Sequence, residues 1–148
     1  MTTIRALSAD DRDDWLPLWA AYISFYESEV SDDVTAATFA RFLDPAVPMH
    51  GAIARDDSGR AVGFVHWLEH LATWSKSGYT YLEDLFVDAG VRGGGVGRAL
   101  IAHVTEAAAA SGSGKVYWLT AETNTTARAL YDRVAKRTGF IHYEIALD

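Results

Sequence analysis

Apolar residues in the first part of the chain recur at spacings of three and four, which is the repeat of an amphipathic helix. This repeat runs from Trp15 to Tyr26. A short β-like run over residues 3–7 precedes it, and residues 35–43 predict a second short helix that ends before Pro45. We therefore expect the chain to begin with one strand and two helices.

Runs of branched and aromatic residues dominate the middle of the chain. Residues 50–55 and 61–71 flank a turn at Asp56–Gly59, which predicts a β-hairpin. A third run, residues 79–87, has the composition of a central strand. The middle of the chain is therefore expected to form a sheet.

The second half of the chain alternates strand-like and helix-like segments. Residues 98–110 and 124–136 have the periodicity of helices, and residues 116–120 between them are a candidate buried strand. Residues 140–147 predict a last strand. No internal repeat or linker interrupts this order, so the sequence predicts a single α/β domain over residues 1–148.

Composition excludes several classes of protein. The 148 residues include no cysteine, which excludes thiol nucleophiles, disulfides and cysteine-based zinc sites. The five histidines show no metal-ligand spacing, so no metal is expected. No apolar run approaches the roughly 18 residues of a membrane helix, and the polar N-terminus is unlike a secretory signal. We expect a soluble, cytoplasmic protein without a membrane partner.

The formal net charge of −7 narrows the choice of partners. Nucleic-acid binding is not expected, because it usually requires a basic surface. The charge is compatible with cationic partners such as small amines, which long-range attraction would favour. Solubility alone also explains it.

A glycine-rich segment, VRGGGVGRAL at Val91–Leu100, stands where a strand-like run gives way to a helix. Such a junction offers unpaired backbone N–H groups and the positive end of the helix dipole, and glycine lets a phosphate approach closely. A P-loop is excluded because Arg98 and Ala99 follow Gly97 where Lys-Ser/Thr is needed, and a dinucleotide fingerprint would need glycine at Arg98. A pyrophosphate site and a flexible loop with a helix cap both remain open.

Three ordered motifs carry a family resemblance. The segment Arg92–Gly97 resembles the R/Q-x-x-G-x-G/A segment of the GNAT superfamily of acyl-CoA-dependent N-acetyltransferases. Residues 124–131 resemble the family's N-x-x-A-x-x-L-Y helix, and residues 138–140 resemble its closing G-F. The likeness covers the whole chain in the order of its helices and strands. Residues 81–87, YLEDLFV, look like the polyamine (spermidine/spermine) and histone acetyltransferase-like branch.

The resemblance implies a GNAT-like fold, with a central mixed, mostly antiparallel sheet, a splayed parallel strand pair and about four flanking helices. It implies acetyl-CoA as co-substrate, with the thioester in the gap between residues 81–87 and 116–120. The residues implied in cofactor binding are Leu85, Phe86, Val87, Arg92, Gly93, Gly94, Gly95, Val96, Gly97, Arg98 and Asn124. Many relatives pair through C-terminal strands or sheet edges, so a homodimer is compatible with the resemblance.

Amine acetylation needs a proton acceptor, because an alkylamine has a pKa around 10.4 and attacks only as the neutral base. It also needs an acid for the departing thiolate and backbone donors for the oxyanion. Tyr131, which matches the family's tyrosine, is the candidate acid, and the alternative is a tyrosine packed in the core. Glu83, in an apolar strand, is the candidate base, and the alternative is a structural ion pair.

Simple alternation along the strand puts Glu83 and Asp84 on opposite faces, with Leu82 and Phe86 on the side of Asp84. One of the two acids can then face the acceptor and the other a structural partner. By resemblance to the polyamine enzymes, Glu83 is the acid that faces the substrate, either directly or through a water molecule.

An acidic, aromatic segment, FYESEV at Phe25–Val30, is a candidate mouth for the acceptor. Tyr26 would pack against an alkyl chain, while Glu27 or Glu29 would hold a distant ammonium group. Glu122 is a similar, weaker candidate. A solvated helix end is the alternative interpretation, and the sequence slightly favours it.

The leading interpretation is an acetyl-CoA-dependent N-acetyltransferase that acts by direct attack of an amine on the thioester. Its acceptor would be a primary amine of a small molecule, such as a polyamine or a lysine-like compound. A protein or peptide lysine acetyltransferase of the same fold is one alternative. A non-catalytic acyl-CoA-binding sensor is another, and the presence of both Tyr131 and Glu83 argues against it.

Overall fold

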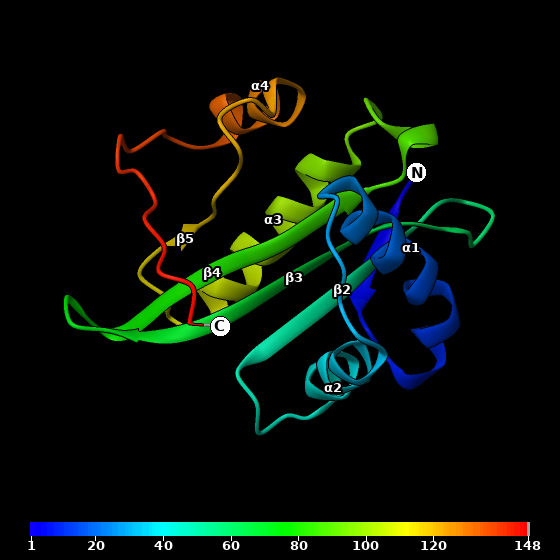
Figure 1. The fold of residues 1–148 in the computed structure, drawn as a ribbon, viewed down its shortest axis with the longest axis horizontal. Coiled ribbons are helices and arrows are strands. Elements are labelled where there is room, and N and C mark those ends of the chain that lie inside the picture. Colours follow the sequence, from blue (N-terminus) through cyan, green and yellow to red (C-terminus); the bar gives the residue numbers. More distant parts are fainter. Residues whose placement is uncertain (148) are drawn as a thin grey trace.

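The computed structural model describes residues 1–147, which form five strands and four α-helices (Figure 1). The strands are β1 (Thr3–Ala6), β2 (Met49–Arg55), β3 (Ala61–Ala72), β4 (Ser75–Val87) and β5 (Val116–Tyr117). The helices are α1 (Arg12–Phe25), α2 (Asp32–Leu43), α3 (Val96–Ala110) and α4 (Thr125–Val134). No helix in this part of the chain is both long and apolar enough to cross a membrane.

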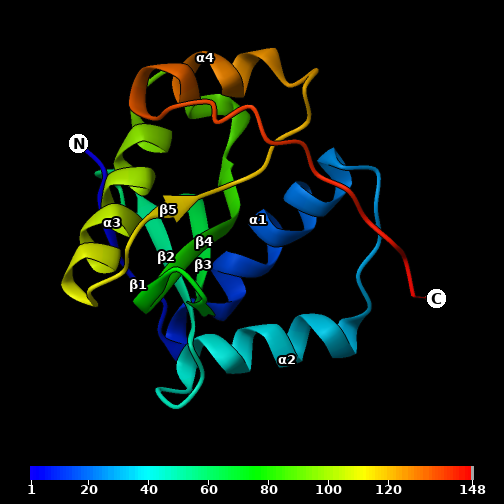
Figure 2. The same cartoon turned by 90° about the vertical axis from the view of Figure 1, so that its left-hand side faces the viewer.

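The five strands form one sheet in the order β1-β2-β3-β4-β5. Neighbouring strands are antiparallel except β4 and β5, which are parallel. Helices α1 and α2 cover one face of the sheet, and α3 and α4 lie on the other (Figure 2). The predicted mixed, mostly antiparallel sheet with flanking helices is confirmed.

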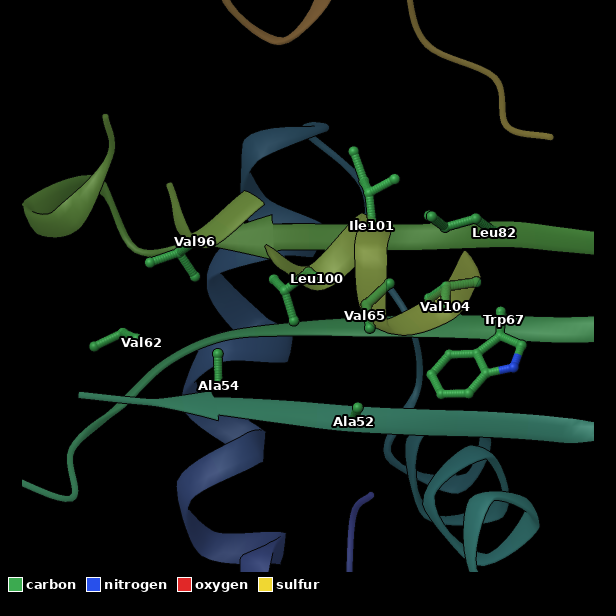
Figure 3. Packing of buried hydrophobic residues seen from close by; sticks show 10 residues of the cluster. All are labelled: Ala52, Ala54, Val62, Val65, Trp67, Leu82, Val96, Leu100, Ile101 and Val104. Carbon is green, nitrogen blue, oxygen red and sulfur yellow. The ribbon is translucent and has the colours of Figure 1, made fainter. Parts of the chain in front are cut away.

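Each face of the sheet has its own hydrophobic core. Under α3, Leu100 and Val104 share a buried cluster with the small residues Ala52 and Ala54 of β2 (Figure 3). On the other face, a second cluster forms around Trp15, which is completely buried. Burying a large apolar side chain stabilises a fold by about 1.5–3 kcal/mol, so two full cores hold the central strands firmly. The strand that borders the site, β4, lies between them.

A β-bulge interrupts β4 at Glu83. Asp84 pairs with His66 of β3, but the next pair joins Leu82 to Trp67. Glu83 is therefore an additional residue on β4 with no counterpart on β3. Such a bulge reverses the direction of the side chains on one side of it relative to the other.

The consequence is visible in the packing of β4. Leu82 lies in the cluster under α3, on the same face as Leu85, while Phe86 packs in the opposite cluster. The expectation that Leu82 shares a face with Asp84 and Phe86 is wrong. Simple alternation holds only along a strand without an inserted residue.

The last part of the chain departs furthest from prediction. Residues 136–147 form no strand, so the strand predicted over residues 140–147 is wrong, and β5 is shorter than predicted. We call this segment the tail. It leaves α4 in an extended course that stands apart from the sheet (Figures 1 and 2). Five large apolar side chains in it are 74% to 92% exposed: Phe140, Ile141, Tyr143, Ile145 and Leu147.

Candidate active site

The parallel strands β4 and β5 separate soon after they meet. Their pairing is limited to Thr80 with Val116 and Tyr81 with Tyr117, after which the chain turns away toward α4 (Figure 1). Beyond Tyr81, the backbone of β4 has no strand partner on this side within residues 1–147. The predicted splayed pair is confirmed, and it leaves backbone hydrogen-bonding groups of β4 facing a gap.

The glycine-rich loop joins the end of β4 to the first turn of α3. Gly93 and Gly95 have φ angles of 88° and 85°, in the left-handed region that favours glycine. The first hydrogen bond of α3 runs from the N–H of Ala99 to the carbonyl of Gly95 at 3.0 Å. The N–H groups of residues 96–98 therefore have no partner within the helix, and they present its positive end to an anion.

The loop leaves space for such an anion. A methyl group built on either of these two glycines would meet no other atom within 4 Å. Gly94 on the same loop and Arg98 in the first turn of α3, also predicted cofactor contacts, are both exposed. Gly97 differs, because a methyl group there would lie 3.1 Å from Leu130, so this glycine also lets α3 and α4 pack closely. The open cradle of backbone donors fits a diphosphate such as that of coenzyme A.

Several residues predicted to bind the cofactor direct their side chains into the protein. Leu85, Val87 and Val96 pack against or within the cluster under α3, and Phe86 packs in the opposite cluster. Packing occupies part of each of these side chains, and the backbone of each residue remains to meet a ligand in the gap. Arg92 donates a hydrogen bond from Nε to the carbonyl of Val87 at 3.2 Å, which fastens the loop to the end of β4.

Tyr131 lies on α4, the helix reached after the chain leaves β5. Its ring meets Trp118 edge-on with ring centroids 5.4 Å apart, and the residue is half-buried. Burial raises the pKa of the phenol, and nearby Tyr26 raises it further. Tyr131 therefore keeps its proton at neutral pH and is suited to protonate a departing thiolate.

A hollow of about 330 Å³ opens between the end of α1 and the start of α4. Phe25, Tyr26 and Glu27 line one side of it, and Asn124 lies on the other. The side-chain amide of Asn124 donates to Oγ1 of Thr120 at 3.2 Å. The predicted acceptor segment and Asn124 are thus brought together although they are far apart in the sequence.

Glu27 has an unusual backbone conformation, with a positive φ of 51°. It ends α1 with two hydrogen bonds, from the N–H of Ser28 to the carbonyl of Ile23 and from its own N–H to the carbonyl of Ser24. This is the Schellman pattern, in which glycine usually occupies the left-handed position. A side chain there costs about 1 kcal/mol, and this one places a carboxylate at the hollow.

The two acids of β4 have different surroundings. Glu83 is exposed on the bulge, and both partial desolvation and the charge of Asp84 raise the pKa of its carboxyl. Asp84 accepts a hydrogen bond from the hydroxyl of Tyr22 at 2.8 Å and another with Nδ1 of His66 at 2.9 Å. Asp84 thus has structural partners, whereas Glu83 forms no hydrogen bond or ion pair through its side chain in the described residues.

Two predicted acceptor-binding acids do not line the hollow between α1 and α4. Glu29 lines a separate groove between α1 and α2, so it does not border the same mouth as Tyr26. Glu122 is exposed, and its carboxylate lies 3.8 Å from the guanidinium of Arg137. Within residues 1–147, no cluster of histidine and acidic side chains could hold a metal ion.

Comparison with known proteins identifies the family. A model of the acetyltransferase (GNAT) family matches residues 13–135. The chain is 39% identical over 142 residues to a D-amino-acid N-acetyltransferase of Saccharomyces cerevisiae, covering 95% of this chain and 88% of that protein.

Solved structures share the fold at lower identity. A ribosomal-protein-alanine N-acetyltransferase from Brucella melitensis biovar Abortus 2308 superposes with a TM-score of 0.82 at 23% identity over 99% of both chains. AAC(6')-Iy, in complex with the bisubstrate analog CoA-S-monomethyl-acetylneamine, superposes with a TM-score of 0.85 at 22% identity, covering 99% of this chain and 98% of that one.

The sheet, its splayed strand pair and the glycine-rich loop define an acyltransferase fold. The family match over most of the chain goes one step further: this chain belongs to the GNAT family of N-acetyltransferases, which use acetyl-CoA as co-substrate. The predicted enzyme class is confirmed. The polyamine and histone branch stays a prediction.

Proposed function

We propose that this protein transfers the acetyl group of acetyl-CoA to the primary amine of a small molecule. The observation that carries the proposal is the gap between β4 and β5, which is bordered by a carboxylate with a raised pKa and by a phenol that keeps its proton. Glu83 and Tyr131 supply the base and the acid that amine acetylation requires. Backbone donors of β4 face the same gap.

Coenzyme A supplies the activated acetyl group, and the chain's own residues hold it. Residues 93–98 bind the diphosphate through backbone N–H groups, with Arg92 and Arg98 adding positive charge. The backbone of residues 85–87 binds the pantetheine arm, and Asn124 contacts it near the acetyl group. The left-handed glycines and the open space beside them support this assignment.

Replacement of Gly95 tests the diphosphate site. Gly95→Ala disturbs the left-handed backbone and adds a methyl group in the cradle, so the affinity for coenzyme A should fall at least tenfold in calorimetry. Gly90→Ala is the matched control, because Gly90 belongs to the same loop, has no positive φ and also has open space beside it. Equal affinities of both variants would contradict the assignment.

In the proposed reaction, Glu83 accepts the amine proton, directly or through one water molecule, as the new C–N bond forms. Backbone N–H groups of β4 stabilise the negative charge that develops on the acetyl oxygen. Tyr131 then gives its phenolic proton to sulfur as the C–S bond breaks. The proton on Glu83 leaves to solvent and Tyr131 is reprotonated, which restores both residues.

Different observations support two classes of acceptor. Glu27 at the hollow and the net charge of −7 favour a cationic amine such as a polyamine. The name of the yeast relative favours an amino acid. The described side chains that line the hollow include no cation to receive an amino-acid carboxylate, so we place the cationic amine first.

An acceptor panel tests the function. Thiol release from acetyl-CoA would be measured with spermidine, D- and L-amino acids, an aminoglycoside and a lysine-containing peptide. We expect the highest kcat/KM with spermidine. A preference for the peptide would favour a protein acetyltransferase. Tight binding of coenzyme A without turnover on any amine would contradict the proposal and support a non-catalytic acyl-CoA sensor.

We further propose that the protein works as a homodimer joined through the tail. The tail exposes five large apolar side chains, and β5 at the end of the sheet has a free outer edge within the described chain. Each copy therefore has a strand-like tail that is not part of a sheet and a sheet edge that has no neighbouring strand among the described residues. In a two-fold dimer, the tail of each copy would pair with the free edge of the other copy, which covers both the edges and the exposed apolar side chains.

The mass in solution tests the dimer. Light scattering should give twice the 16.2 kDa mass of the chain, and deletion of residues 138–148 should give a monomer. Val34→Ser is the control, because it removes an exposed apolar side chain from α2, outside the tail, and should leave the mass unchanged. A monomeric full-length protein would contradict this proposal without affecting the proposed reaction.

A further inference from the structure

A chain of hydrogen bonds crosses the core beneath the bulge, and none of the roles above uses it. Nε1 of Trp15 donates to Nε2 of His66 at 3.0 Å, and Nδ1 of His66 lies 2.9 Å from one carboxylate oxygen of Asp84. The other oxygen accepts the hydroxyl proton of Tyr22 at 2.8 Å. The chain joins α1, β3 and β4 and ends at a half-buried hydroxyl.

The protonation state of His66 follows from its partners. An indole N–H can only donate, so Nε2 of His66 acts as an acceptor and carries no proton. The proton is therefore on Nδ1, which donates to Asp84. The ring stacks on Phe64 with centroids 4.4 Å apart and is almost completely buried. Burial lowers the pKa of His66, so the ring stays neutral and its orientation is fixed.

Tyr22 has one hydroxyl proton, and Asp84 receives it. Burial and the neighbouring Asp84 both raise the pKa of Tyr22, which therefore remains a phenol. With its proton committed, the oxygen can interact with a further group only by accepting a hydrogen bond. The matching ligand group is a donor, such as the N–H of an amine.

Tyr22 lies beside the gap between the strands. It is one helical turn before Tyr26, and the two rings meet edge-on with centroids 5.1 Å apart. Tyr131 of α4 is near enough to raise its pKa. Its partner Asp84 directly follows Glu83 on the bulge. The hydroxyl therefore lies near the candidate acid and is bound to the residue that follows the candidate base.

We propose that the oxygen of Tyr22 binds the reacting nitrogen of the acceptor, and that Asp84, His66 and Trp15 position this oxygen. The inference rests on the proposed function. A neutral primary amine has two N–H bonds and one lone pair. One N–H is donated to Tyr22 and the other to Glu83, which leaves the lone pair directed at the acetyl carbon. Sequence periodicity offered one signal for Tyr22, its place on the same helix face as Tyr26.

The main test is Tyr22→Phe, which keeps the ring and removes the oxygen. We expect kcat/KM for the amine to fall at least tenfold, with unchanged affinity for coenzyme A and unchanged far-UV spectrum. The loss should be the same for spermidine and for a short monoamine such as propylamine, because Tyr22 binds the reacting nitrogen and not a distant charge. Tyr79→Phe, on β4 outside the site, is the control.

The outcomes distinguish a failure of the role of Tyr22 from a failure of the proposed acetyltransferase function. An active wild-type enzyme with equal kcat/KM in Tyr22→Phe would overturn the role of Tyr22 alone. A loss confined to spermidine would also overturn it, since that pattern belongs to recognition of a distant ammonium group. Absence of turnover on every amine by the wild-type protein would overturn the proposed function together with this inference.

A second variant tests the positioning role of Asp84. Asp84→Asn removes a negative charge next to Glu83, and the phenol of Tyr81 on β4 is the other titratable group that interacts with the charge of Glu83. We expect a lower kcat/KM and an acid limb of the pH profile displaced to lower pH. A stability loss with an unmoved pH profile would show that Asp84 has a structural role only.

Discussion

Two tyrosines lie around the gap, and the hydrogen-bond partner of each hydroxyl distinguishes their roles. Tyr22 gives its proton to Asp84, so its oxygen is left as an acceptor. Tyr131 donates to no side chain or carbonyl among the described residues, so its proton is available to a leaving group. Burial raises the pKa of both phenols. The hydrogen-bond partner therefore separates two residues of the same type.

Tyr131→Phe is expected to lower kcat at least tenfold and to leave the affinity for coenzyme A nearly unchanged. General-acid contributions are on the order of 10² to 10⁴, and removal of the phenolic oxygen keeps the packing against Trp118. Single-turnover kinetics and calorimetry would measure the two quantities. An unchanged rate of C–S cleavage would remove Tyr131 from the mechanism.

Glu83 predicts a pH dependence with a defined sign. Its carboxyl has a pKa above the ordinary value of 4.5, and only the ionised form is a base. Activity should therefore be present above the raised pKa and be lost as the pH falls through it. The acid limb of kcat should have its midpoint above pH 4.5, measured with an acceptor of low amine pKa.

Glu83→Gln should remove this acid limb and lower kcat. The expected loss is on the order of 10²- to 10⁴-fold, which is the usual contribution of a general base. Persistence of the same acid limb in Glu83→Gln would assign the titration to another group. The folded state can be followed by circular dichroism over the same pH range, so that loss of structure is not mistaken for loss of the base.

The end of α1 combines a conformational cost with a charge. Glu27 occupies the left-handed position of the helix end, where glycine would be relaxed, and its carboxylate stands at the hollow. Strained residues at functional sites often persist because the side chain is needed there. Because the backbone conformation and the charge can be changed independently, substitutions of Glu27 can separate its effect on stability from its effect on substrate binding.

Glu27→Gly is expected to raise the free energy of unfolding by about 1 kcal/mol, because the left-handed strain is removed. The same change should raise KM for spermidine several-fold, since it removes the carboxylate. Glu27→Gln keeps the backbone strain and removes only the charge, so it should raise KM without stabilising the fold. Denaturant titration and steady-state kinetics give the two values, and a stabilised Glu27→Gly with unaltered KM would leave Glu27 without a role in binding.

Local patterns were sufficient to predict most helices and strands. The repeat from Trp15 to Tyr26 gave α1, and the Asp56–Gly59 turn gave the β2–β3 hairpin. The bulge at Glu83 was not predictable, because an inserted residue is defined only by pairing with β3. The contact of Tyr22 and His66 with Asp84 joins three distant segments, so no local spacing reveals it. Residues 140–147 have the sequence pattern of a strand but form none, because a strand also needs a neighbouring strand to pair with.

The charge of the whole molecule gives a prediction that separates the two acceptor classes. With a net charge of −7, a cationic acceptor is attracted over long distances, and salt screens this attraction. KM for spermidine should rise several-fold between about 0.05 M and 0.5 M NaCl, over which the screening length falls well below 10 Å. KM for a zwitterionic amino acid should change little, and equal salt dependence of both would remove electrostatic attraction from acceptor choice.

The extra residue on β4 also limits which changes of length this protein can accept. Deletion of Glu83 would leave Leu82 and Asp84 on their present faces, because they pair with adjacent residues of β3, but it would remove the candidate base. Deletion of Leu85 would instead turn every following side chain of the strand over, so that Phe86 would enter the apolar layer beneath α3. One residue more or less at the Asp56–Gly59 turn would only alter an exposed loop. Relatives that keep this chemistry should therefore vary in length at the hairpin turn and hold a constant spacing between the β4 acids and the glycine-rich loop.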